Sequence, residues 1–233
     1  MSATKEIGTL AGIDLLADLD EAVRINLEKA CGWKRYSAGE QIIDRQSESR
    51  DVFFVVEGRV RVVIYSMSGR EITLDDVASG GHFGELAALD GAPRSASVMA
   101  LEPCMVASLP PDQFLDLLGM SSDASYKVMR DLARIVRTAT DRIMDLSTLA
   151  ANNRVQAELL RQARTNMTGD NQAQISPIPI HADIAGRVST TRETVARVMS
   201  DLSRQGVLSR GKSALDVPDV DRLAAMVEEV RGE

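Results

Sequence analysis

The chain has few cysteines and no long apolar run. Only Cys31 and Cys104 occur in 233 residues, and neither belongs to a C-x-x-C pair. Two isolated thiols cannot supply a disulfide framework, a zinc site or an iron–sulfur cluster on their own. No apolar stretch approaches the roughly 20 residues that span a bilayer, and the N-terminus lacks a signal-peptide pattern. We therefore expect a cytoplasmic protein with structural thiols, no metal and no membrane partner.

The chain also lacks an excess of positive charge. Its formal net charge is −7 and its pI is near 5.0, which by itself argues against nucleic acid, because phosphate binding needs a positive surface. The charge is unevenly distributed, however. Between residues 183 and 212 the cations are Arg187, Arg192, Arg197, Arg204, Arg210 and Lys212, against the acids Asp183, Glu193 and Asp201. A local basic surface near the C-terminus is therefore compatible with the acidic total.

Apolar spacing in the first half of the chain indicates one helix followed by many short strands. Residues 14–30 carry apolar side chains at helical spacing. From 36 to 109 short apolar runs alternate with glycine-containing turns; the runs are 41–43, 52–56, 60–64, 72–74, 95–101 and 104–109. Strands of this length and spacing are typical of an antiparallel sandwich, here a jelly-roll-like β-roll.

Helical spacing returns after residue 110 and continues through a long helix at 122–149. A 4-3-4-3 spacing typical of a coiled-coil seam joins Val128, Leu132, Ile135, Ala139, Arg142, Leu146 and Leu149. We expect this seam to form a homodimer, while a second apolar edge at Val136 and Ile143 packs on the β-roll. The alternative is that the seam itself only packs on the β-roll.

The rest of the chain predicts a small, mostly helical domain. Asn152 and Asn153 are plausible N-caps of a helix that ends near residue 164, and 175–180 resembles an extended edge segment. A final helix is expected at 218–233, its apolar face packed on its own domain; that face is Val220, Leu223, Val227 and Val230. The predicted fold class is α+β, with a β-roll at 1–121, a dimerisation helix and hinge at 122–150, and a DNA-binding domain at 151–233.

The segment 80–96, GGHFGELAALDGAPRSA, has the composition of an anion-binding loop. Gly84 allows a close backbone approach, and the first N–H groups of a short helix from Glu85 have no intrahelical acceptor. Arg94 offers a planar fork of donors, and Ser95 adds a hydroxyl. The Glu85 carboxylate repels phosphate but accepts from a ribose hydroxyl, so a phosphate and a sugar side by side indicate a nucleotide, and a single arginine suits the single charge of a cyclic one. The alternative is an ordinary surface salt bridge between Glu85 and Arg94.

The G-E-L and P-R-S-A strings of this segment resemble the phosphate-binding cassette of the CRP/FNR superfamily, most closely its cyclic AMP receptor type. The resemblance implies that Gly84, Glu85 and Leu86 meet ribose and phosphate, and that Arg94 and Ser95 bind phosphate. It also implies that a Thr-Ser pair on the long helix meets the base.

Ala139 and Thr140 stand at the positions of that pair, so only half of it is present. Without the first hydroxyl, the resemblance to the family no longer implies a strict preference for adenine. We therefore expect Thr140 to contact the base of cyclic AMP, with cyclic GMP as an alternative ligand. Thr140 as a helix-surface residue without a ligand is the other interpretation.

Residues 181–207, HADIAGRVSTTRETVARVMSDLSRQGV, have the spacing of two short amphipathic helices. The turn between them contains Ser189, Thr190 and Thr191, which also provide an N-cap. The second helix exposes Arg192, Glu193 and Arg197 near its N-terminus. Arginine pairs with guanine and glutamate accepts from cytosine, so this helix is expected to contact base edges in a major groove.

The string T-x-R-E-T-V-x-R, at 190–197, is similar to the recognition element of the same superfamily. It implies DNA contacts from Thr191, Arg192, Glu193 and Arg197, a wing hairpin after Gly206, and palindromic double-stranded DNA with GTGA-like half-sites. It also implies RNA polymerase as a further partner. The expected protein is an allosteric transcription regulator in which cyclic nucleotide reorients the two recognition helices.

Three other function classes remain as alternatives. Some members of the superfamily bind haem or another small molecule in the same β-roll, and His82 stands beside the cassette. A cyclic-nucleotide module without DNA binding would share the cassette but lack the helix-turn-helix. An enzyme is not expected, because the chain has no nucleophile elbow, Walker loop or H-E-x-x-H motif.

Overall fold

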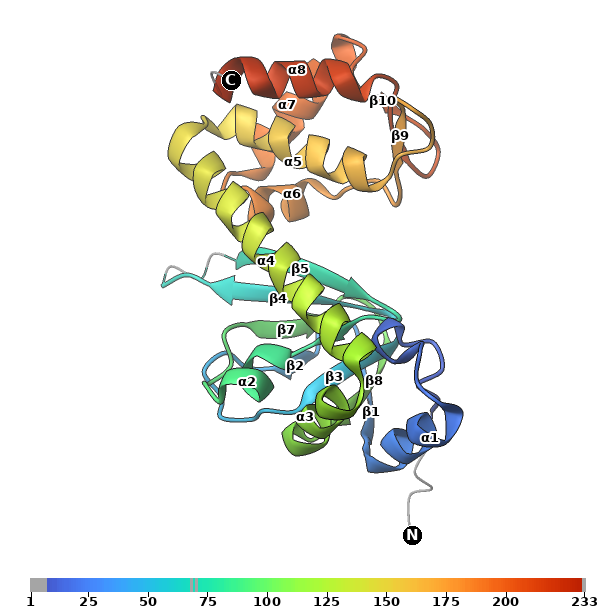
Figure 1. The fold of residues 1–233 in the computed structure, drawn as a ribbon. Coiled ribbons are helices and arrows are strands. Elements are labelled where there is room, and N and C mark those ends of the chain that lie inside the picture. The colour runs from blue at the N-terminus through green and yellow to red at the C-terminus, as the bar shows by residue number, and fades with distance from the viewer. Residues whose placement is uncertain (1–7, 68, 70, 232–233) are drawn as a thin grey trace. The chain divides into compact units, whose positions relative to one another are not determined.

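The computed structural model describes residues 8–67, 69 and 71–231. The chain divides into two compact units, Met1–Arg134 and Ile135–Glu233, each with its own core, and they are described separately (Figure 1). The division falls inside the long helix α4 (Ser122–Thr148). Among the described helices, none is both long enough and apolar enough to cross a membrane.

The first unit contains two four-stranded antiparallel sheets. One has the strand order β1-β8-β3-β6, formed by Gly32–Tyr36, Cys104–Leu109, Val52–Glu57 and His82–Phe83. The other has the order β2-β7-β4-β5, formed by Gln41–Ile43, Ser97–Ala100, Arg59–Tyr65 and Glu71–Ala78. The predicted β-roll is confirmed. Strands β1 and β6 were not predicted, because β1 is largely polar and exposed and β6 has only two residues.

Helices cover one side of this β-roll. Phe114 and Leu117 of α3 (Pro111–Met120) are fully buried in the same apolar cluster as Phe54 and Leu109 of the sheet and Val128 of α4. The predicted leading helix at 14–30 is wrong as one element. It consists of a short 3-10 helix, Asp14–Leu16, and α1, Glu21–Ala30. Leu15 and Leu16 are both buried, whereas consecutive residues of an α-helix point about 100° apart.

Helix α4 has the predicted length, and its apolar side chains differ in how far they are buried. Val128 is 3% exposed against the β-roll, and Leu149, just past the helix, is 4% exposed in the core of the second unit. Val136 and Ile143 belong to the second unit and are 64% and 63% exposed, and their expected packing on the β-roll stays a prediction. Because Val128 faces the β-roll, Met129 one position later faces away and continues the Val136 and Ile143 row at seven-residue spacing.

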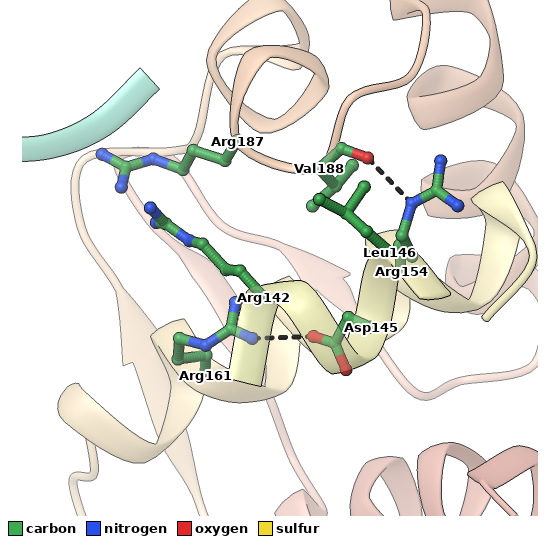
Figure 2. A pocket seen from close by; sticks show the side chains of 7 residues that line it. All are labelled: Arg142, Asp145, Leu146, Arg154, Arg161, Arg187 and Val188. Carbon is green, nitrogen blue, oxygen red and sulfur yellow. Dashed lines mark hydrogen bonds and ion pairs between the residues drawn. The ribbon is translucent and has the colours of Figure 1, made fainter. Parts of the chain in front are cut away.

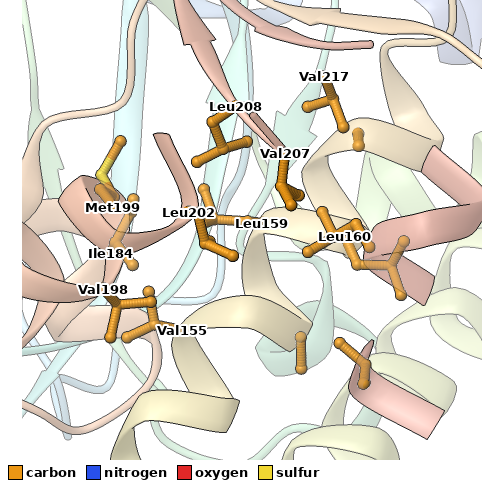
Figure 3. Packing of buried hydrophobic residues seen from close by; sticks show 14 of the residues in the cluster. Val155, Leu159, Leu160, Ile184, Val198, Met199, Leu202, Val207, Leu208 and Val217 are labelled. Atoms are coloured by element: carbon orange, nitrogen blue, oxygen red, sulfur yellow. The ribbon is translucent and has the colours of Figure 1, made fainter. Parts of the chain in front are cut away.

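The second unit is a helical domain with a small three-stranded sheet. Its helices are α5 (Ala151–Thr165), α6 (His181–Arg187), α7 (Arg192–Arg204) and α8 (Val220–Arg231). The sheet has the order β10-β11-β9, formed by Ser209–Arg210, Leu215–Val217 and Ala173–Ile175. Figure 3 shows apolar side chains of α5, α6 and α7 meeting in one core, among them Leu159, Ile184 and Leu202.

Two local predictions in this unit are wrong. The N-cap of α5 is Ala150, without a side-chain cap, and Asn152 and Asn153 lie inside the first turn. The predicted edge segment 175–180 is strand only as far as Ile175. Proline has no N–H to give to a sheet ladder, and Pro177 and Pro179 end the pairing there. The hairpin of β10 and β11 confirms the expected wing.

Helix α8 packs on its own domain, as expected, through Val220, Leu223 and Val227. Val230, expected on the same face, is 45% exposed in the last turn of the helix. Gly232 and Glu233, the predicted end of this helix, lie outside the described residues, as do residues 1–7 of the predicted first domain.

Asp219 and Asn171 hold the start of α8. The Asp219 carboxylate accepts from Asn171 Nδ2 at 3.0 Å and from the Arg222 backbone N–H at 2.9 Å, and Asn171 Oδ1 accepts from the Asp221 N–H at 2.8 Å. The Arg222 N–H, and then the Asn171 amide, hold the pKa of Asp219 below its ordinary value. A depressed folded-state pKa stabilises the fold at neutral pH, and this contribution disappears as the pH falls through that pKa.

We expect Asp219→Asn to lower the thermal unfolding temperature at pH 7. The difference from the unchanged protein should shrink as the pH falls below the ordinary aspartate pKa and vanish below the depressed pKa of folded Asp219, because both proteins then lack the charge. Circular dichroism at several pH values measures this difference. The control is Glu228→Gln, which removes an exposed acid of α8. If the difference in unfolding temperature between Asp219→Asn and the unchanged protein does not vary with pH, the capping role is wrong.

Candidate functional site

The cassette begins with a left-handed glycine. Strand β6 ends at Phe83, and Gly84, with φ +86°, is the N-cap of the short helix α2 (Glu85–Asp90). A Cβ atom at position 84 would lie 2.8 Å from Arg94 Nη1 and 3.2 Å from the Asp51 carbonyl oxygen. Both the backbone conformation and the available space therefore require glycine here.

Arg94 is held at the centre of the cassette. Its side chain is buried, with 3% exposure, and its guanidinium lies 5.5 Å from the centre of the Phe53 ring. It donates from Nη1 to the Gly84 carbonyl at 2.8 Å, from Nη2 to the Asp51 carbonyl at 2.7 Å and from Nε to Ser49 Oγ at 3.1 Å. A guanidinium has five N–H groups, so these three bonds orient the side chain and leave two donors.

Glu85 lies beside Arg94, and its residue is 9% exposed. Within the described residues, no hydrogen bond to its carboxylate is found. Burial lowers the pKa of the Arg94 guanidinium, and the nearby carboxylates of Asp51 and Glu85 oppose that effect. The alternative of a surface salt bridge is wrong, since both side chains are buried and no ion pair joins them in the described part of the chain.

The other predicted effector residues are more open. Ser95 is exposed and Leu86 is 37% exposed. Thr140 belongs to the second unit, where it is exposed on α4 and donates from Oγ1 to the Val136 carbonyl at 2.9 Å. Its donor is thus used within the helix, while its oxygen lone pairs can still accept.

The anchors of Arg94 were not predicted from the sequence. Ser49 and Asp51 belong to the connection before β3, and Phe53 belongs to β3 itself. They lie more than 40 positions before Arg94 in the chain. Phe53 is stacked on Phe83, with ring centres 5.1 Å apart. No local pattern connects these residues, because the pairing of β3 with β6 brings them together.

Helix α7 has the geometry expected of a recognition helix. Thr191 caps it, with Oγ1 accepting from the Thr194 N–H at 3.3 Å, and the buried face is Val195, Val198, Met199 and Leu202. Arg192, Glu193 and Arg197 are all exposed: Glu193 and Arg197 lie opposite the buried face, and Arg192 is the first residue of the helix. The Glu193 backbone N–H, and then the Thr191 hydroxyl, hold the pKa of Glu193 below its ordinary value. The glutamate is therefore an ionised acceptor at neutral pH.

Two features of this domain were not predicted. Arg197 donates from Nη2 to Asn152 Oδ1 of α5 at 3.2 Å. Behind the helix-turn-helix, a pocket is lined by Arg142, Asp145, Leu146, Arg154, Arg161, Arg187 and Val188 (Figure 2). All of these residues belong to the second unit. Four arginines at one pocket are a concentration of charge that needs nearby acceptors.

Two family models match the chain. The model described as a cyclic nucleotide-binding domain matches residues 33–121, and the model described as a Crp-like helix-turn-helix domain matches residues 153–226. The second match excludes the alternative of a cyclic-nucleotide module without a DNA-binding domain. The matched ranges contain the cassette and α7, respectively.

Known proteins resemble this chain over most of its length. It is 31% identical over 195 residues to the cyclic AMP receptor protein of Thermus thermophilus, covering 84% of this chain and 86% of that protein. It is 31% identical over 190 residues to Vfr of Pseudomonas aeruginosa, described as a cAMP-activated global transcriptional regulator, covering 78% and 88%. A solved CRP-family transcriptional regulator, also from Thermus thermophilus, is similar with 29% identity and a TM-score of 0.61, covering 86% and 97%.

Vfr and the solved Thermus thermophilus protein are named as transcriptional regulators. The β-roll, the long helix and the capped recognition helix occur here in one chain, and both family models and the curated relatives agree with that arrangement. The chain therefore belongs to the CRP/FNR family of transcription regulators, with a cyclic nucleotide-binding domain followed by a helix-turn-helix domain.

Proposed function

We propose that this regulator binds cyclic AMP in the Gly84–Ser95 cassette, and that the bound form recognises palindromic DNA as a homodimer. The observation that carries this proposal is the buried Arg94, oriented by backbone carbonyls beside a Glu85 carboxylate without a donor. We divide the chain functionally into a nucleotide domain at 1–121, a dimerisation helix and hinge at 122–150 and a DNA-binding domain at 151–233.

The chemistry of the cassette suits a cyclic phosphate diester. Such a group carries one negative charge, which the two remaining donors of Arg94 can meet. Ser95 adds an exposed hydroxyl, and the backbone at Glu85 and Leu86 begins α2 with unpaired N–H groups. The Glu85 carboxylate then accepts from the ribose hydroxyl, which supplies the donor that it otherwise lacks.

The choice between adenine and guanine rests on α4. With Ala139 in place of the first hydroxyl, only Thr140 is left to contact the base, so cyclic GMP remains the alternative effector. Two relatives carry cyclic AMP in their names, which favours that nucleotide. Calorimetric titration with each nucleotide decides which one binds. If neither nucleotide produces a heat of binding, the proposed sensor function is wrong. A Soret band in the absorption spectrum would instead favour haem at His82.

The proposed dimer places one α7 helix at each half-site. Arg192 and Arg197 are suited to guanine and Glu193 to cytosine, which agrees with GTGA-like half-sites. The centres of the two half-sites are then about one helical turn, or roughly 34 Å, apart. Nucleotide contact with Thr140 favours the dimer geometry that fits this spacing. RNA polymerase is the further partner that we propose for transcription control.

We expect Arg192→Ala to relax the base preference at one position of each half-site. Loss of an arginine–guanine pair costs about 1–3 kcal/mol of discrimination, whereas binding to unrelated DNA changes little. DNA selection followed by gel shifts at fixed salt concentration measures both quantities. Arg204→Ala, near the other end of α7, is the matched control. If Arg192→Ala keeps its discrimination, Arg192 does not contact a base.

A further inference from the structure

Helix α5 carries two arginines on one face. Arg154 and Arg161 are seven residues apart, which is close to two helical turns, so their side chains leave the helix in nearly the same direction. Both line the pocket of Figure 2 and both reach from α5 to the end of α4, and Arg154 also reaches the turn of the helix-turn-helix. We call these two residues the α5 arginine pair.

Arg154 connects the α4–α5 junction to the turn of the helix-turn-helix. It donates from Nη1 to the Leu149 carbonyl at 2.8 Å, from Nε to the Val188 carbonyl at 2.9 Å and from Nη2 to the Ser189 carbonyl at 3.2 Å. Ser189 has φ +52°, a left-handed conformation that is costly for a residue other than glycine. One guanidinium thus fixes both the junction and the strained turn that precedes α7.

Arg161 connects α5 to α4 and, through Glu158, to α6. It donates from Nη2 to Asp145 Oδ2 of α4 at 2.9 Å and from Nη1 to Glu158. Glu158 Oε1 in turn lies 3.9 Å from Nε of Arg187, which is in α6. Asp145 and Glu158 are only 5% and 2% exposed, so these carboxylates depend on their arginine partners.

We propose that the α5 arginine pair consists of positioning residues, which hold the recognition helix in a fixed orientation relative to the last turns of α4. Arginine suits these positions because its five donors are spread over a rigid planar fork that reaches separated acceptors, whereas an ammonium presents three donors at a single atom. Both residues lie on α5 and not on the recognition helix α7. The α5 arginine pair acts through Arg187, the last residue of α6, and through Ser189 in the turn that leads into α7.

This inference rests on the DNA-binding function but not on the identity of the effector. We would compare full-length Arg154→Lys and Arg161→Lys with Arg164→Lys, which replaces an exposed arginine of the same helix. For each variant, affinity is measured for the selected operator and for unrelated DNA at the same salt concentration. We expect the ratio of the two affinities to fall roughly tenfold in the first two variants only, with little change for unrelated DNA.

Hydrogen exchange on the same proteins gives a readout that needs no operator. We expect Arg154→Lys to accelerate exchange together at 145–153 and 188–195, while α8 keeps its protection. An unchanged exchange pattern, or uniform acceleration through the whole unit, overturns the proposal. So does an equal loss of affinity for both DNAs, which indicates only a smaller folded fraction. If selection yields no operator for the unchanged protein, the proposed operator fails, and the exchange result still decides on the arginine pair.

Discussion

Replacing Arg94 by glutamine is expected to weaken cyclic AMP binding at least about 100-fold. The substitution removes a buried charge and the two donors that we propose for the phosphate, and hydrogen bonds between charged groups contribute about 1.5–3 kcal/mol each. Two such bonds correspond to a factor of roughly 100 or more in the dissociation constant. Isothermal titration calorimetry with cyclic AMP measures the loss directly.

The expected loss is separable from unfolding. Arg94 also holds the Gly84 and Asp51 carbonyls, so Arg94→Gln should lower the thermal unfolding temperature somewhat, since one amide replaces three donors. Circular dichroism below that temperature establishes that the domain remains folded. Arg35→Gln, which removes an exposed arginine of the same β-roll, serves as the control. A folded Arg94→Gln protein with unchanged affinity would contradict the phosphate-binding role.

A second large effect is expected from Ile143→Asp, which should convert a dimer into monomers. Ile143 is 63% exposed in the single chain and lies in a row with Met129 and Val136, at seven-residue spacing along α4. In the proposed dimer with two α4 helices paired in parallel through this row, Ile143 faces its own counterpart or lies next to it. The substitution therefore buries two like charges at the interface while changing little in the monomer.

Sedimentation velocity over a range of protein concentrations measures the change. Arg137→Asp, one residue beyond Val136 and off the apolar row, is the matched control and should leave the dimer in place. Ile135→Asp tests the seam expected from the sequence, which passes through Ile135 and Arg142. If Ile135→Asp dissociates the protein and Ile143→Asp does not, the original seam is the interface. If both variants remain dimers, the interface lies elsewhere.

Much of this architecture could be predicted because the patterns involved are local. Short apolar runs between glycines predicted the β-roll strands from β2 to β8 apart from β6, and helical spacing predicted α4 almost to the residue. The Thr191 cap was also foreseeable, since a threonine before an amphipathic run is a common N-cap. These features depend on neighbours within a few positions.

The features that were missed depend on distant parts of the chain. Arg94 is anchored by residues more than 40 positions earlier, and Arg154 contacts the Ser189 turn 35 positions later. The choice of face on α4 has the same origin. Val128 and Met129 begin two adjacent apolar rows, and sequence spacing alone does not say which row the β-roll covers. Within the first unit, Val128 is buried in the cluster of the β-roll and Leu132 packs against that cluster.

The most direct test of the regulatory account is operator affinity measured with and without saturating cyclic AMP, in the unchanged protein and in Arg94→Gln. Since an effector shifts the equilibrium only by its differential affinity for the two states, the account predicts at least about tenfold tighter DNA binding with nucleotide. It also predicts that this gain disappears in Arg94→Gln. Equal operator affinity with and without nucleotide in the unchanged protein would contradict it.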